Sequence, residues 1–132
     1  MLTGTFKQQN QQTKEEMVGE IWDASIQEAH GQGQLDYVFH NGEEEIQVVM
    51  QWNAEQIWIK ESGQHFQLYL ELWYGHEGEG YVKTPEGMML LTTRLQSFDY
   101  QEDEEQHTCQ LCYDLLQAGD AMGSKLTIQL AK

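Results

Sequence analysis

The chain has 132 residues, of which 39% are apolar and 11% aromatic, so it is long enough to bury one continuous core. Its 22 acidic and 7 basic residues give a formal net charge of −15 at pH 7, which repels phosphate backbones and anionic lipid headgroups. The sequence contains no apolar run long enough to span a membrane, and residues 1–7 lack the apolar run of a signal peptide. We therefore expect one cytosolic domain over residues 1–132 that binds neither nucleic acid nor membranes.

Apolar residues recur at every second position along much of the chain, which is typical of half-buried β-strands. The alternation is clearest in residues 57–61, 66–72, 110–115 and 126–130. The predicted strands cover residues 2–8, 15–29, 34–40, 44–52, 55–61, 65–73, 79–84, 88–98, 107–116 and 124–131.

The segment 15–29 admits two interpretations. Its first residues, 15–18, could begin a helix, whereas Gly19 and the β-formers Ile21, Trp22 and Ile26 favour a strand. We predict a strand here and keep the helix as the alternative.

Short segments rich in turn-forming residues separate the predicted strands, for example at 41–42, 62–63, 85–87 and 118–120. Short connections favour antiparallel neighbours, and many short strands without helical patterns between them indicate a sandwich or a barrel. We predict an all-β, up-and-down antiparallel barrel of about eight to ten strands, closed or nearly closed.

Two cysteines, Cys109 and Cys112, have the spacing found in zinc and redox motifs, but no second pair accompanies them. On a strand, residues three positions apart point to opposite faces, so these sulfur atoms could not share a metal ion. We expect no metal site and no cofactor.

The acidic segment 102–105, with Asp99 before it, lacks the glycine and the closing glutamate of a calcium loop. It is typical of a solvated hairpin tip. The sequence also lacks the spacing of metalloprotease, serine-hydrolase and phosphate-loop motifs, so no catalytic residue is assigned.

Aromatic residues are numerous for a chain of this length, and most are expected to pack in the core. A ligand cavity inside the barrel would draw on some of them. The residues that we assign to such an interior site are Tyr37, Trp52, Glu61, Tyr81 and Tyr113.

Three other aromatic residues, Trp58, Tyr69 and Trp73, alternate with the apolar residues of their strands and are expected on the outer face. Together they could form a patch that contacts a partner protein or a second copy of the chain.

The order of features from residue 57 to residue 130 resembles a known family. Ser62-Gly63 is followed by an amphipathic strand, by Gly80-Tyr81 and residues 84–87, by an acidic hairpin, by residues 111–115 and by a closing segment at 123–128. This order resembles the YwiB-like family of small, uncharacterised bacterial proteins. The resemblance implies a lipocalin-like (calycin) β-barrel and a bacterial cytosolic origin, and it implies no activity. Similar proteins tend to have an arginine just before the Ser-Gly turn, where this chain has Glu61, so no role of that arginine is carried over.

Our leading interpretation is a non-enzymatic binding module whose barrel interior holds at most one small, largely apolar ligand. The first alternative is an acidic structural or interaction protein with a filled core, which self-associates as a homodimer or binds a basic partner. The second alternative is a hydrolase or isomerase that uses buried carboxylates. A cavity of a few hundred cubic ångströms favours the ligand, and a solid core favours interaction.

Glu61 shares strand parity with Ile57 and Ile59, so a regular strand points it into the barrel. A carboxylate there must reach water, pair with a cation or take up a proton. We therefore consider two roles for Glu61, an anchor for a polar or cationic ligand group and a strand-end residue tilted into solvent.

We predict no measurable binding to DNA or RNA at physiological salt, because the chain has few cations to displace condensed counterions. A salt titration with a random duplex tests this, and micromolar binding would contradict it.

Overall fold

The computed structural model describes residues 2–132, which form a closed barrel of ten antiparallel strands. The strands are Leu2–Asn10 (β1), Glu16–Ala29 (β2), Gln32–Asn41 (β3), Glu44–Trp52 (β4), Gln56–Ser62 (β5), Gln67–Trp73 (β6), Gly78–Thr84 (β7), Gly87–Glu102 (β8), Gln106–Gln117 (β9) and Asp120–Ala131 (β10). Each strand pairs with its neighbours in sequence, and β1 closes the barrel by pairing with both β2 and β10. The prediction of an all-β, up-and-down closed barrel is confirmed.

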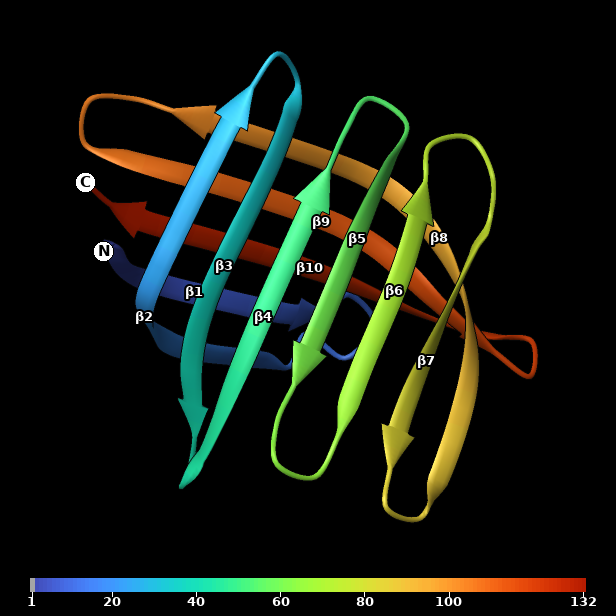
Figure 1. Ribbon diagram of the computed structural model, residues 1–132. Coiled ribbons are helices and arrows are strands. Elements are labelled where there is room, and N and C mark those ends of the chain that lie inside the picture. The colour runs from blue at the N-terminus through green and yellow to red at the C-terminus, as the bar shows by residue number, and fades with distance from the viewer. Residues whose placement is uncertain (1) are drawn as a thin grey trace.

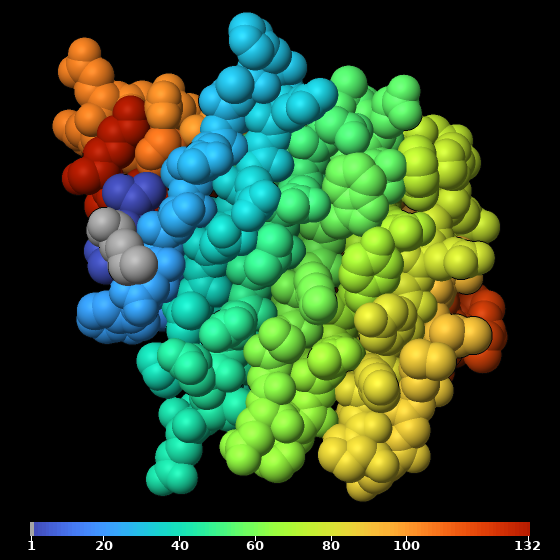
Figure 2. Space-filling model, in the orientation of Figure 1, coloured from blue at the N-terminus to red at the C-terminus, as the bar shows by residue number. Residues whose placement is uncertain are grey.

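The barrel is flattened into two layers that cross at a steep angle. Figure 1 shows β2 to β7 in one layer with β1, β10 and β9 crossing behind them. The long strand β8 curves from one layer into the other, and a register shift between Leu95 and Ser97 marks an irregularity along it. In Figure 2 the side chains of the front layer form a continuous surface over the core.

Alternation, interrupted by register shifts in β2 and β8, places one set of side chains of each strand inside the barrel. In β4, for example, Ile46, Val48 and Met50 are buried, whereas Gln47 and Gln51 are exposed. Because every strand contributes an inner row, the rows meet in one continuous apolar core.

Segment 15–29 is a strand, so the helix considered as its alternative is excluded. Its pairing with β3 shifts register between Trp22 and Ser25, and Asp23 there has a positive φ of 53°. This bulge lets both Ile21 and Ala24 be buried although they lie three positions apart.

Strand β8 continues beyond the predicted end at residue 98 and includes Phe98, Tyr100 and Glu102. Tyr100 and Phe98 pack against Trp52, with ring centroids 5.6 and 5.2 Å apart. These contacts keep the segment in the sheet although its sequence is acidic. The hairpin tip is therefore limited to residues 103–105, whereas Asp99 and Glu102, which were expected in the tip, lie in β8.

Cys109 is buried on the inner face of β9, and Cys112 lies half-buried on the outer face of the same strand. The expectation that the two sulfur atoms face opposite sides is confirmed.

Burial raises the pKa of Cys109 to about 12, which makes its thiol unreactive near neutral pH. Residues 2–132 contain no group of three or more histidine, cysteine or acidic side chains arranged to hold a metal ion.

The connections β1–β2, β3–β4, β5–β6, β7–β8 and β9–β10 gather at one end of the barrel, which we call the mouth end. The β9–β10 connection is a two-residue hairpin in which Ala118 and Gly119 have φ values of 52° and 87°, as in a type I′ turn. The chain termini and the other connections lie at the opposite end (Figure 1). Within the described part of the chain, no helix is long and apolar enough to cross a membrane.

We predict that Gly33→Ala lowers the free energy of unfolding by about 1–3 kcal/mol. A Cβ atom at Gly33 would collide with the indole of Trp52, which is buried against Phe98 and Tyr100 and cannot move freely. Chemical denaturation measures the change, and Gln32→Ala, an exposed neighbour on the same strand, should stay within about 0.5 kcal/mol of wild type. Equal stability of the two variants would contradict the prediction.

Candidate functional site

The mouth end of the barrel contains a cavity of about 510 Å³. Its apolar wall consists of Val82, Met89, Leu91, Leu115, Ala121 and Met122, and its polar rim of Asn10, Gln12, Thr13, Gln117 and Asp120. This volume lies in the range of pockets that hold small organic molecules, and an apolar wall with a few polar groups at its edge is typical of such pockets.

Strand register explains why these side chains meet. Val82 of β7 lies opposite Met89 of β8, and Leu115 of β9 lies opposite Met122 of β10. Directly opposite residues in an antiparallel pair point to the same face of the sheet. All four therefore project from the inner face, at the point where the barrel opens toward solvent.

Two methionines at the mouth remain exposed although they face the cavity. Met89 has 40% and Met122 has 50% of its surface accessible. Methionine is flexible and polarisable, so it adapts to ligands of different shape. The accessible sulfur-containing side chains give the cavity an apolar entrance.

A polar layer lies immediately below the cavity. The next inner-face residues, two positions deeper along β9, β10 and β1, are Tyr113, Ser124 and Gln8. Gln8 donates a hydrogen bond from Nε2 to the Tyr113 hydroxyl at 3.2 Å. The floor beneath the apolar wall therefore carries hydrogen-bonding groups, and Tyr113 is only 4% exposed.

Glu61 lies in the opposite layer of the barrel, and its side chain faces this polar region. It lies opposite Val48 on β4 and Leu68 on β6, and Leu68 in turn lies opposite the cavity residue Val82. The Glu61 side chain thus faces inward, two strands away from the cavity wall, and it is half-buried. Within residues 2–132 it forms no salt bridge, because the ion pairs of the structure involve other acidic residues.

Desolvation raises the pKa of Glu61 above the usual carboxyl value. Burial is the cause, and no second carboxylate contributes to the shift.

The hydroxyl groups of Tyr37 and Tyr113 are electrostatically coupled to Glu61. Burial raises the pKa of both hydroxyls well above the usual value, and the negative charge of Glu61 raises it further. Both hydroxyls therefore remain protonated and can donate hydrogen bonds at physiological pH.

Three of the five residues that the sequence assigned to an interior site thus lie together: Tyr37, Glu61 and Tyr113. Trp52 is also inside the barrel, but it is four residues from Val48 along β4, which is about 13 Å in an extended strand. It packs with Phe98 at the end of the barrel opposite the mouth.

The interior position predicted for Tyr81 is wrong. Tyr81 lies opposite Tyr69 on the outer face, and the two rings stack with centroids 5.6 Å apart. The inner positions of β7 on either side of it are taken by Gly80 and Val82, and a Cβ atom at Gly80 would collide with the Tyr69 carbonyl oxygen and with Leu70.

Trp58, Tyr69 and Trp73 lie on the outer face, as their strand parity predicted. Each is half-buried. Tyr69 donates a hydrogen bond to Glu71 Oε1 at 3.0 Å, and Trp73 stacks on His76 with ring centroids 5.0 Å apart. Their role as a contact surface for a partner stays a prediction.

Sequence reasoning missed the cavity wall itself. Leu115 continues the inner row of Leu111 and Tyr113, so the alternation in β9 was a usable signal. Met89 and Met122 gave no such signal, because the sequence does not say which positions of β8 and β10 lie at the mouth.

We predict that Glu61→Gln changes the pH dependence of stability. An acid with a raised pKa binds more protons in the folded state, so its contribution is present at low pH and is lost as the pH rises through the folded pKa. The variant cannot ionise at this position, so its free energy of unfolding relative to wild type should increase between about pH 4 and pH 8. Denaturation curves of both proteins across this pH range measure the difference in their free energies of unfolding. The other acidic residues contribute equally to both proteins, so their contributions cancel. If the two proteins have the same denaturation midpoint at every pH, the interior role of Glu61 is contradicted, and only its interpretation as a strand-end residue tilted into solvent is left.

Comparison with known proteins agrees with this architecture. Residues 2–128 match the family described as Domain of unknown function (DUF1934), whereas a comparison with curated proteins finds no match. The crystal structure of the ywiB protein from Bacillus subtilis is similar, with a TM-score of 0.70 and 15% identity over 98% of this chain and 89% of that chain. At this identity the likeness concerns the fold, and it confirms the resemblance to YwiB-like barrels. The chain belongs to the DUF1934 family.

Proposed function

We propose that the protein is a non-enzymatic binding module that holds one small, largely apolar ligand in the cavity at the mouth of the barrel. The observation that carries this proposal is the apolar cavity of about 510 Å³, formed by inner-face side chains of β7 to β10. A core that was solid up to the mouth would instead favour a purely structural protein.

The ligand enters with its apolar body against Leu91, Leu115 and the two methionines of the mouth. Removing apolar surface from water supplies the affinity, at roughly 25 cal/mol per Å² before the costs of association. The polar rim then fixes the orientation of the ligand.

A polar end of the ligand points toward the layer formed by Tyr113, Ser124 and Gln8, with Glu61 and Tyr37 on the opposite side. Glu61 has no cation partner within residues 2–132, and the tyrosine hydroxyls stay protonated. A ligand group that donates a hydrogen bond or carries a positive charge is complementary to the carboxylate.

The proposal places the protein in the cytosol, where a reducing environment keeps both cysteines as thiols. A net charge of −15 disfavours anionic ligands, which supports a neutral or cationic one.

We predict that wild type binds the neutral fluorescent probe N-phenylnaphthylamine saturably, with one probe per chain. Met89→Glu should weaken this binding at least about tenfold, because it places a carboxylate against the apolar ligand. Leu90→Glu is the matched control. It adds the same charge at the next position of β8, where the side chain is 72% exposed on the outer face, and it should change the affinity by less than about twofold.

Fluorescence titration measures both variants, and both substitutions are at accessible positions that tolerate a charge. Equal losses in the two variants would assign the effect to net charge and contradict the proposed site. Native mass spectrometry of freshly purified protein identifies a retained small molecule and the subunit count in the same measurement.

A further inference from the structure

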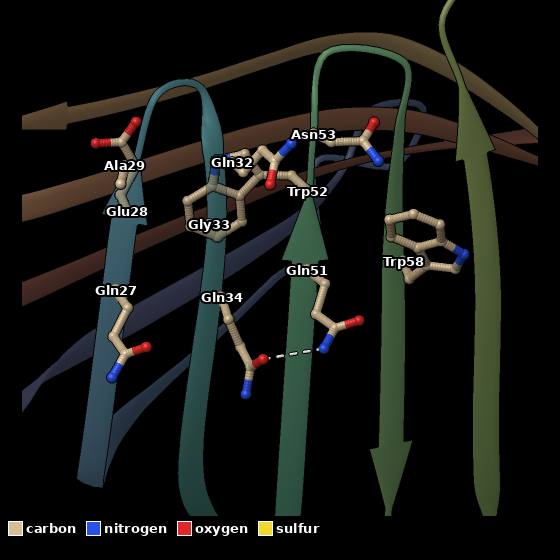
Figure 3. Close-up of a pocket in the computed structure, with 10 residues that line it drawn as sticks. All are labelled: Gln27, Glu28, Ala29, Gln32, Gly33, Gln34, Gln51, Trp52, Asn53 and Trp58. Carbon is tan, nitrogen blue, oxygen red and sulfur yellow. Dashed lines mark hydrogen bonds between the residues drawn. The ribbon is translucent and has the colours of Figure 1, made fainter.

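A second hollow lies on the outer face of the barrel, at the end opposite the mouth. It is an open groove of about 470 Å³ across β2 to β5 (Figure 3). None of the residues that line it contributes to the cavity at the mouth.

A row of three glutamines and one tryptophan crosses this groove. Gln27 lies opposite Gln34, Gln34 lies opposite Gln51, and Gln51 lies opposite Trp58. Figure 3 shows the four side chains in this order across the four strands. The strands that carry these amide groups and the indole ring lie about 4.8 Å apart.

The amides are held in place and still have free hydrogen-bonding capacity. Gln51 donates from Nε2 to Gln34 Oε1 at 3.0 Å, and Gln34 donates to Asp36 Oδ2 at 3.1 Å. Each amide has two N–H donors and two acceptor sites on its oxygen, so the carbonyl oxygen of Gln51 and remaining N–H groups are available to a ligand.

Gly33 lines the upper end of the groove in Figure 3. The indole of Trp52 fills the space that a Cβ atom of Gly33 would occupy, and it lies inside the barrel with 5% of its surface exposed, so it offers little surface to a ligand. Trp58, on the outer face, provides the accessible, half-buried indole at the side. The groove thus combines one accessible indole ring, that of Trp58, with a row of neutral hydrogen-bonding groups.

The lining is also almost uncharged. Glu28 is its sole charged side chain among the described residues, in a chain with 22 acidic and 7 basic residues. Without a lysine or arginine the groove cannot neutralise a phosphate or carboxylate, and the acidic surface around it repels both. A neutral ligand is therefore the one that matches this groove.

We propose that the groove binds a neutral carbohydrate. A sugar ring has C–H groups on its faces, which pack on the indole of Trp58, and hydroxyl groups around its edge, which both donate to and accept from amides. Gln34 and Gln51 supply these amide partners, and the open form of the groove accommodates successive rings of an oligosaccharide.

The test is a titration of the whole protein with neutral hexasaccharides, namely maltohexaose, cellohexaose, xylohexaose and mannohexaose, with hexagalacturonic acid as the anionic comparison. Nuclear magnetic resonance follows the indole N–H of Trp58 and the side-chain amides of Gln34 and Gln51. At least one neutral hexasaccharide should shift these signals saturably, and the acid should not.

Variants then assign the site. Trp58→Ala should weaken binding at least about tenfold, through loss of the stacking surface, and Gln51→Ala about fivefold, through loss of hydrogen bonds. The matched controls are Trp22→Ala, an exposed tryptophan on the outer face of β2, and Gln47→Ala, an exposed outer-face glutamine on β4. Both controls should bind as wild type does.

The proposal is overturned if no neutral hexasaccharide binds, if the anionic one binds more tightly, or if Trp58→Ala and Trp22→Ala lose affinity equally. Because Trp58 is only half-buried, folding of its variant is expected, and circular dichroism checks it. If Trp58→Ala is unfolded, the comparison of Gln51→Ala with Gln47→Ala tests the proposal, because both positions are exposed on the same strand. Equal affinities of these two variants would then overturn it.

Discussion

The pairing of β1 with both β2 and β10 is the constraint on which the rest of the structure depends. It closes the sheet, so every strand has two partners and no edge is left to pair with another chain. In a closed sheet each residue points either into the barrel or out of it. The period-two pattern of the sequence therefore becomes a division between one shared interior and one surface, and both candidate sites follow from it.

The interior changes in character from one end to the other. Trp52, Phe98 and Tyr100 close the end opposite the mouth, and aliphatic side chains fill the middle. Toward the mouth the rows become polar, at Tyr113 and Glu61, and then apolar again at the cavity wall. A buried hydroxyl needs a partner, which Gln8 supplies to Tyr113. Glu61 instead keeps contact with solvent, and burial raises its pKa, so a bound donor would stabilise its charged form.

Local alternation predicted most of the strands and the inward direction of Glu61, whereas the disputed segment 15–29 was predicted from its β-forming residues. It failed at Tyr81, because an aromatic ring was assumed to prefer the core. Tyr81 alternates with the inner-face residues Gly80 and Val82, so its ring lies outside and stacks on Tyr69. The cavity was beyond prediction for a related reason. Its wall combines residues of β7, β8, β9 and β10, and only the register between these strands shows that Val82 and Leu115 reach the same end.

The same separation of faces explains how one small barrel can present two sites of different chemistry. The cavity at the mouth is apolar because the last inner-face side chains of β7 to β10 line it. The groove is polar because outer-face side chains of β2 to β5 line most of it, and these side chains do not pack in the core. Neither site contains a lysine, arginine or histidine among its lining residues, and the surrounding charge is strongly negative. Anions are therefore disfavoured at both sites by the field of the whole protein rather than by a particular contact. Selection among the remaining ligands then depends on shape and desolvation. At the mouth, binding removes the apolar body of a ligand from water. In the groove, the hydroxyl groups of a sugar ring replace hydrogen bonds to water with hydrogen bonds to the amides beside Trp58.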